Sequence, residues 1–264
     1  MELIVENLSV RFGHKLVLDR VTFRAMEGER LGIVGESGVG KSTLAKALTR
    51  LVPVQSGGIW LGGTPILGLG GRHLKKARRR FQVLFQNPYA TLDPAMTVAD
   101  HVLEAIRCHE PTLSRQEAME KAAGLLDRVG LAGRGGALPG ELSGGQRRRA
   151  SLARVLATSP ELLIVDEPTT GLDALARAEV LDLLREVAAT VKVFILITHD
   201  LRDVRALCTR VLVLYQGLLV EDRPVQEFRP GTPTLHPYAA SLLAAEQRLA
   251  PAHSPPAAGR GSCA

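Results

Sequence analysis

A glycine-rich stretch, GESGVGKST at residues 35–43, has the residue types that bind phosphate. It fits the pattern G-x-x-x-x-G-K-[ST], with Gly35, Gly40, Lys41 and Ser42 at the fixed positions. Glycines let backbone N–H groups close around phosphate oxygens, and a helix that begins there adds a favourable dipole. Lys41 is expected to reach the β- and γ-phosphates of a nucleotide, and the Ser42 hydroxyl to ligate Mg²⁺. The other loop residues that we expect at the nucleotide are Glu36, Ser37, Gly38 and Thr43.

Two acidic residues end an apolar run, ELLIVDEP, that is typical of a buried strand. Beside a phosphate loop, Asp166 is the candidate Mg²⁺ ligand and Glu167 the group that orients or deprotonates an attacking water. His199 ends a second apolar run, VFILITHD, and parallel strands would bring it to the same edge, within reach of the γ-phosphate. The alternatives are a helix N-cap or surface pair for the two acids and a structural role for the histidine.

A second glycine-rich turn raises a question. The stretch ELSGGQRRRA, residues 141–150, opens a basic helix and also has the shape of an anion site. A protein that binds one nucleotide needs only one such turn. Binding of a single nucleotide therefore does not explain why the chain has the second turn.

The segments around these motifs alternate between strand and helix patterns. This alternation predicts an α/β core with a mostly parallel sheet. Residues 2–34 consist largely of strand patterns, which indicates an antiparallel β subdomain, and residues from about 88 to 150 have apolar side chains at helical spacing, which predicts an all-helical insert. We expect one domain over residues 2–245 and a disordered tail at 250–264, which is rich in Pro, Gly, Ala and Ser.

The composition limits the partners. The net charge is +6, which favours phosphate-bearing partners. Cys108, Cys208 and Cys263 are far apart in the sequence, which argues against a disulfide framework and for a reducing compartment. The N-terminus is unlike a signal peptide, and no apolar run reaches the roughly 18–20 residues needed to span a bilayer. If the protein serves membrane transport, another chain must form the pore.

Two other groups of residues invite a function. His101, Cys108 and His109 share one face of a predicted helix, but three residues of one helix rarely complete a metal site. The arginine runs at 78–80 and 147–149 suggest nucleic acid, yet aromatic residues are only 4% of the chain. Solvated faces are therefore the favoured interpretation of both runs.

The motifs together resemble those of ATP-binding-cassette ATPases. The set comprises Phe12, GESGVGKST, FQNP, LSGGQ, LLIVDEP, GLD and ITHD, and the resemblance covers nearly the whole chain, from about residue 2 to residue 245. In this family the SGGQ turn of one subunit covers ATP held by the phosphate loop of another, so two head-to-tail subunits trap two ATP molecules. The resemblance thus explains the second turn. It implies ATP and Mg²⁺ as cofactors and a contact with the partner's ATP through Ser143, Gly144, Gly145 and Gln146.

The resemblance also assigns roles to single residues. Phe12 corresponds to the aromatic residue that stacks on adenine, although a core phenylalanine is the alternative. Gln86 corresponds to the glutamine that contacts Mg²⁺ and links the catalytic site to the helical insert. Asp173, in GLD, corresponds to a residue of a loop that crosses the dimer, and it could also be a helix N-cap. The family more usually has SALD where this chain has TGLD.

Two further stretches, FQNPYATLDPAMTV and LHPYAASLLAAE, resemble the oligopeptide, dipeptide and nickel import subfamily. That implies an energy-coupling subunit at the cytoplasmic face of the cell membrane. Its partners would be two permease subunits, a second ATPase subunit, either identical or related, and a solute-binding protein that acts through the permease, with no direct contact to nucleic acid. The short C-terminus favours nickel or a metal chelate as solute, with short peptides as the alternative. A soluble ATPase acting on DNA or ribosomes and an exporter subunit remain the other interpretations.

Overall fold

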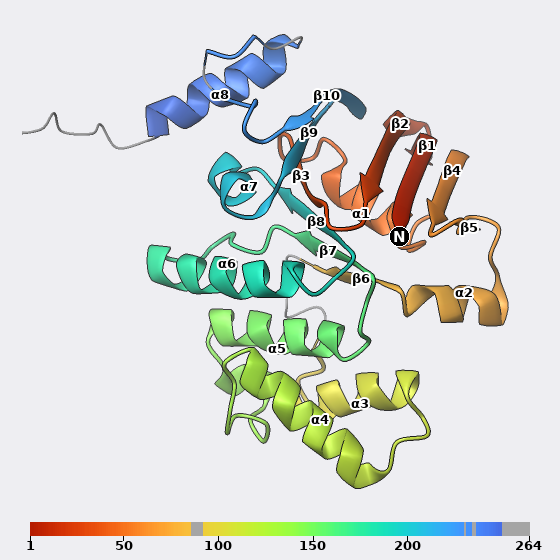
Figure 1. Ribbon diagram of the computed structural model, residues 1–264, viewed down its shortest axis with the longest axis vertical. Coiled ribbons are helices and arrows are strands. Elements are labelled where there is room, and N and C mark those ends of the chain that lie inside the picture. Colours follow the sequence, from red (N-terminus) through yellow and green to blue (C-terminus); the bar gives the residue numbers. More distant parts are fainter. Residues whose placement is uncertain (86–91, 230, 234–235, 250–264) are drawn as a thin grey trace, which may run out of the picture.

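Six strands form the larger sheet. They are β3 (Arg30–Val34), β6 (Phe81–Leu84), β7 (Leu162–Asp166), β8 (Val193–Thr198), β9 (Arg210–Tyr215) and β10 (Leu218–Pro224). The structure, a computed structural model, describes residues 1–85, 92–229, 231–233 and 236–249. The strand order is β10-β9-β3-β8-β7-β6, and all neighbours are parallel except β10 and β9 (Figure 1). The predicted α/β core with a mostly parallel sheet is confirmed.

The two faces of this sheet belong to different apolar cores. Every residue of β7 and β8 is buried, as expected for parallel strands covered on both sides. Alternate side chains point to opposite faces, so Ile164 and Ile195 join one core while Val165 and Leu196 join the other. The helices involved are α1 (Lys41–Leu48) on the first face and α5 (Gly144–Leu156), α6 (Ala174–Ala188) and α7 (Leu201–Leu207) on the second.

A smaller antiparallel sheet packs over α1. Its strands are β1 (Glu2–Phe12), β2 (Lys15–Met26), β4 (Ser56–Leu61) and β5 (Thr64–Pro65), in the order β2-β1-β4-β5. Its inward residues share a core with Leu44 and Leu48 of α1. The predicted antiparallel subdomain is confirmed, and it fixes the helix that follows the phosphate loop.

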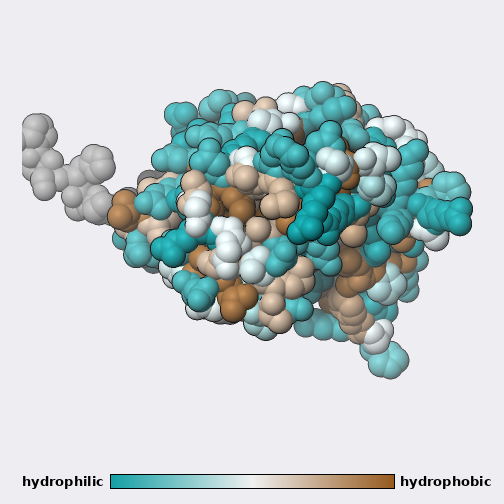
Figure 2. All heavy atoms as spheres, turned by 90° about the horizontal axis from the view of Figure 1, so that it is seen from below, coloured by the Kyte–Doolittle hydropathy of each residue, from teal (hydrophilic) through white to brown (hydrophobic). Residues whose placement is uncertain are grey.

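The helical insert lies at the opposite end of the molecule from the small sheet (Figure 1). It contains α3 (Val98–His109), α4 (Arg115–Arg128) and the short 3₁₀ turn η2 (Pro139–Glu141), and α5 follows it. Thr97 and Ser114 begin α3 and α4 with capping boxes, while Val98, Val102 and Ile106 are buried on the inner face of α3. Figure 2 views this end, where hydrophilic residues predominate and apolar residues lie in scattered groups.

Most of the arginine residues in the two runs bind the chain itself, so the interpretation as solvated faces is wrong for them. Arg79 donates to the carbonyl oxygens of Cys108 and His109 at the end of α3, and Arg80 forms an ion pair with Glu161 at 2.6 Å. The Arg79 contacts satisfy main-chain acceptors at the end of α3 and tie the insert to the core, whereas the Arg80 pair lies within the core. The sequence shows the charges but not the carbonyl groups that approach them.

In the second run, Arg148 donates to the carbonyl oxygens of Pro168 and Thr170, and Arg149 pairs with Glu179 at 2.8 Å. Arg148 is only 8% exposed, so its charge is almost wholly removed from solvent. These side chains therefore join α5 to the segment after β7 and to α6, and they are not a free basic surface.

Two helices complete the described fold, α2 (Gly71–Arg78) and α8 (Pro237–Leu249). None of the described helices is both long enough and apolar enough to cross a membrane. The proposed domain limits of 2–245 and 88–150 stay predictions, and the tail at 250–264 lies outside the described residues.

The turn after β3 depends on the lack of a side chain at Gly35. A Cβ atom there would lie 2.3 Å from the carbonyl oxygen of Leu214 in β9. We predict that Gly35→Ala lowers the free energy of unfolding by about 1–3 kcal/mol, because backbone has to move. Gly124→Ala is the control, since a Cβ on Gly124 meets no atom within 4 Å in α4. It should raise stability by about 0.5–1 kcal/mol. Equal urea midpoints for the two variants would contradict this prediction.

Candidate functional site

The phosphate loop joins the end of β3 to the start of α1. Gly38 and Gly40 have φ values of 80° and 115°, a region that side chains with a Cβ rarely adopt. Gly40 is the N-cap of α1 and has no side chain to bond the first-turn N–H groups. These groups are left for another acceptor, which fits the predicted phosphate site.

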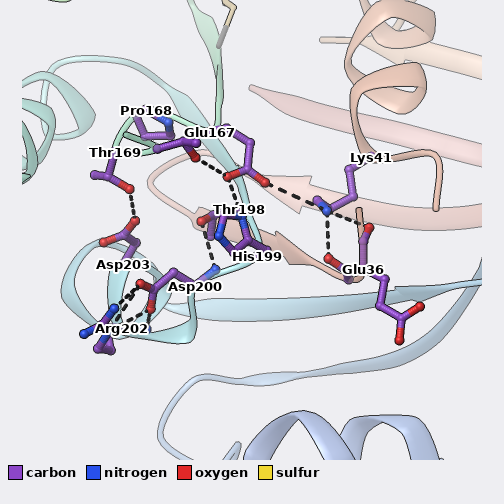
Figure 3. Close-up of polar contacts among 12 residues, drawn as sticks. Glu36, Lys41, Glu167, Pro168, Thr169, Thr198, His199, Asp200, Arg202 and Asp203 are labelled. Carbon is purple, nitrogen blue, oxygen red and sulfur yellow. Dashed lines mark hydrogen bonds and ion pairs between the residues drawn. The ribbon is translucent and has the colours of Figure 1, made fainter. Parts of the chain in front are cut away.

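Lys41 lies at the centre of this loop. Its ammonium group is largely buried and donates to the carbonyl oxygens of Gly35 at 2.7 Å and Glu36 at 2.9 Å (Figure 3). Burial lowers the pKa of Lys41, and the nearby carboxylates of Glu167 and Asp166 oppose this effect. The loop thus holds a cation where the phosphate chain is expected.

Asp166 ends β7 beside the loop. The carboxylate is only 3% exposed, and its Oδ1 atom has no hydrogen-bond partner among the described residues. Burial raises the pKa of Asp166, while a hydrogen bond from Ser42 lowers it. A buried carboxylate oxygen without a partner, next to the Ser42 hydroxyl, is the oxygen-rich donor set that Mg²⁺ prefers. The two predicted Mg²⁺ ligands in the described chain are therefore adjacent and fit the ion.

Glu167 follows directly, at a backbone φ of 50°. Its Oε2 atom accepts a hydrogen bond from the Thr170 hydroxyl at 2.9 Å and lies 2.7 Å from His199 Nδ1, while Oε1 lies 3.9 Å from Lys41 Nζ (Figure 3). Left-handed backbone at a residue other than glycine is strained and persists only where its surroundings hold it. The contacts fix one carboxylate oxygen and leave the other toward the loop, as a general base for water would require.

The phosphate loop and Glu167 line a cleft of about 450 Å³. Its lining consists of Ser37, Gly38, Gly40, Lys41, Ser42, Thr43, Glu167, Thr170 and His199. The structure therefore brings the phosphate loop, Glu167 and His199 together, as the sequence predicted. Thr170 was missed by the sequence analysis; the available signal was a hydroxyl three residues after the glutamate, in DEPTT.

The second turn is not part of the cleft lining. Ser143 is the N-cap of α5: its hydroxyl accepts from Gln146 N at 3.2 Å, and Gln146 Oε1 accepts from Ser143 N at 3.0 Å. Gly144 and Gly145 form the first turn of that helix. The predicted role of the four residues at a partner's ATP stays a prediction.

Other predicted residues lie on separate elements. Phe12 is 47% exposed at the end of β1, so its side chain is outside the core. Asp173 is the N-cap of α6, with Oδ1 accepting from Ala176 N at 2.9 Å, as the alternative interpretation proposed. Gln86 lies outside the described residues. His101 is buried, with Nε2 3.1 Å from the carbonyl oxygen of Asp93, and belongs to the insert core.

Known proteins share this architecture. The family described as ABC transporter matches residues 18–170. Among solved structures, the dimeric post-hydrolysis state of the ATP-binding cassette MJ0796, bound to ADP and Pi, superposes with a TM-score of 0.76 at 26% identity. The match covers 84% of this chain and 98% of that chain.

Curated relatives are more similar in sequence. The oligopeptide transport ATP-binding protein OppF of Bacillus subtilis (strain 168) is 39% identical over 231 residues, which are 86% of this chain and 75% of OppF. The glutathione import ATP-binding protein GsiA of Pectobacterium atrosepticum is 40% identical over 232 residues, 86% of this chain. This chain spans only 36% of the length of GsiA. The resemblance to ATP-binding-cassette ATPases is thus confirmed, and the chain belongs to the ABC transporter family, whose ATP-binding proteins are ATPases.

Proposed function

We propose that this chain is the ATP-hydrolysing, energy-coupling subunit of an ABC importer. The observation that carries the proposal is the position of the Glu167 carboxylate, held by Thr170 and His199 beside Lys41 at a phosphate loop. The supporting comparison is the similarity to OppF and GsiA, which are named as transport and import proteins.

The residues divide the chemistry among them. The backbone N–H groups at the start of α1 bind phosphate oxygens, and the Lys41 ammonium neutralises charge on the β- and γ-phosphates. Ser42 and Asp166, with Gln86, would hold Mg²⁺, which supplies charge neutralisation when bound. Glu167 accepts the proton of the attacking water, and His199 binds the γ-phosphate while keeping the glutamate oriented. Phe12 stacks on adenine.

A complete site requires a second subunit in this proposal. Ser143 and the glycines after it cover the ATP of that partner, and Asp173 contacts it across the dimer. ATP binding closes the pair, and the closure drives a separate permease. Two permease subunits and a solute-binding protein complete the proposed assembly, which places this chain at the cytoplasmic face of the cell membrane.

The proposed permease contact is a groove of about 410 Å³ between the core and the insert. Gln82 and Leu84 of β6, Glu104 of α3 and Arg154 of α5 are among its lining residues. Because Gln86 follows β6 closely in the sequence, a permease bound in this groove would act on the strand that precedes this proposed Mg²⁺ ligand.

The proposed solute is a short peptide. OppF is named for oligopeptides and GsiA for glutathione, which is itself a tripeptide. The expectation of nickel rested on the short C-terminus, and these two relatives add no support for it. Nickel uptake stays a prediction that the transport experiment below distinguishes.

The first test removes the proposed base. Glu167→Gln should retain ATP affinity and lose hydrolysis by on the order of 10²-fold or more, because an amide cannot accept the proton of water. ATPase rates and ATP binding of the purified chain measure this. Glu161→Gln is the control, since Glu161 directly precedes the same strand and pairs with Arg80. Unchanged hydrolysis in Glu167→Gln would remove Glu167 from its proposed role.

The second test concerns the shared site. A Lys41→Ala subunit should lose its own phosphate loop but still offer its SGGQ turn, whereas a Ser143→Arg subunit has the opposite defect. Mixed in one dimer, or placed in matched partner subunits, they should form one intact site and recover ATPase activity that neither has alone. A mixture as inactive as its components would show that both motifs serve the ATP of one subunit.

Ser143→Arg also removes a helix cap, which costs about 1 kcal/mol. Ser114→Arg is the matched control, because Ser114 caps α4 with the same type of capping box. It should lose similar stability but retain hydrolysis. Equal losses of activity in the two serine variants would attribute the effect to the cap.

The third test addresses the solute. Cells that lack this gene should take up di- and tripeptides more slowly while their nickel content stays normal. Growth on peptides and cellular nickel should be measured in the same cultures. A selective fall in nickel would overturn the peptide assignment, and normal values of both would overturn the importer assignment to this subfamily.

A further inference from the structure

Asp203 is a buried charge that has no part in the proposed chemistry. It lies on α7, its side chain is 0% exposed, and it does not line the cleft. Its Oδ2 atom accepts a hydrogen bond from the Thr169 hydroxyl at 2.5 Å (Figure 3). Its Oδ1 atom accepts hydrogen bonds from Arg177, from Nε at 3.0 Å and from Nη2 at 2.6 Å. The carboxylate thus joins the segment after β7 to α6 and α7.

The first connection to the catalytic glutamate runs through the two threonines. Asp203 holds the hydroxyl of Thr169, and the next residue, Thr170, donates its own hydroxyl to Glu167 Oε2 at 2.9 Å. A shift of Thr169 would therefore move the donor that orients Glu167.

The second connection runs through the other partner. Arg177 Nη2 also pairs with Asp200 Oδ2 at 2.6 Å. Asp200 directly follows His199, whose Nδ1 lies 2.7 Å from the same Oε2 atom of Glu167. The contacts therefore form a closed ring, and both connections end on one oxygen of the proposed base.

Electrostatics explains why this ring is specific. Burial raises the pKa of Asp203, and the Thr169 hydroxyl and Arg177 oppose that effect. Burial also acts against ionisation of Asp200, yet hydrogen bonds from Arg202 and Arg177 lower its pKa to about 2. A buried ion pair is often no more stabilising than apolar residues of the same size. What this ring adds is a defined arrangement of side chains.

The glutamate needs such support. Its φ of 50° is strained, and strained backbone persists only where its surroundings determine it. Arg148, on the helix that begins with the SGGQ turn, holds the same segment from another side through the carbonyl of Pro168. The segment between Glu167 and Asp173 is thus fixed by side chains from α5, α6 and α7.

We infer that Asp203 is a positioning residue for Glu167, acting through the Thr169–Thr170 pair and through Arg177 and Asp200. The inference rests on the proposed ATPase function. It assigns a role to a buried residue that does not line the cleft.

Thr169→Val is the sharpest test, because it removes one hydroxyl at nearly constant volume and leaves the Arg177–Asp203 ion pair in place. Its kcat should fall about tenfold while KM for ATP stays unchanged, since orientation of the base is lost and not binding. Thr169→Ser should restore kcat. In the Glu167→Gln background, Thr169→Val should have no further effect, because the ring acts through that carboxylate.

Thr49→Val is the control. Thr49 is buried like Thr169, and its hydroxyl donates to the carbonyl of Ala45 at 2.9 Å, outside the ring. Asp203→Asn should lower kcat as Thr169→Val does; if it unfolds, the threonine variants decide. A Thr169→Val chain with wild-type kcat, or a loss that persists in the Glu167→Gln background, overturns the inference.

A readout independent of hydrolysis separates this inference from the proposed function. The imidazole ¹H–¹⁵N signals of His199 should shift in Thr169→Val and not in Thr49→Val, because His199 contacts the carboxylate that the ring orients. Unchanged His199 signals contradict the inference. Absence of ATPase activity in the wild-type chain would instead overturn the proposed function.

Discussion

The register of three parallel strands determines where the phosphate loop, Glu167 and His199 lie. Val34 of β3 pairs with Thr198 of β8, and Asp166 of β7 pairs with Ile197 of β8. The strands therefore end at one level, and the residues that follow them, Gly35, Glu167 and His199, meet without any long loop. Because the strands are buried on both faces, a shift of register by one residue would move the apolar side chains of each core into the other core, where they would not fit the packing. The packing of the sheet thus fixes the relative positions of the residues in the site.

At this end of the strands, the positive charge of Lys41 and the negative charges of Asp166 and Glu167 are buried close together. Burial lowers the pKa of Lys41 and raises the pKa of Asp166, so each charge alone is disfavoured where it lies. Neighbouring groups stabilise each charge. Two carbonyl groups and Glu167 stabilise the Lys41 ammonium, and a hydrogen bond from Ser42 stabilises the Asp166 carboxylate. The Oδ1 atom of Asp166 is left without a partner in the described chain, and a divalent cation would favour its ionised form. The electrostatics of the site is therefore suited to a phosphate with its metal ion.

The sequence predicts what is local and leaves out what is formed between distant elements. The phosphate loop and the strand-end acids are visible because loop, strand and helix are contiguous in the chain. The ring through Thr169, Arg177 and Asp203 is not visible, because it joins residues of three elements whose approach depends on tertiary packing. The prediction that the arginine runs are solvated faces was wrong for the same reason. Their partners are carbonyl groups and acids that no sequence pattern indicates.

The capping residues show that a structural role and a functional role need not exclude each other. The Ser143 hydroxyl accepts a hydrogen bond from Gln146 N, yet a hydroxyl has one donor and two acceptor sites. Its proton therefore remains to be donated to a phosphate oxygen while the cap stays intact. Asp173 can also combine both roles, because Oδ1 caps α6 and the second carboxylate oxygen can accept a further hydrogen bond. The proposed closure of two subunits could thus use both residues without unwinding either helix, because the hydrogen bonds that cap α5 and α6 would stay in place.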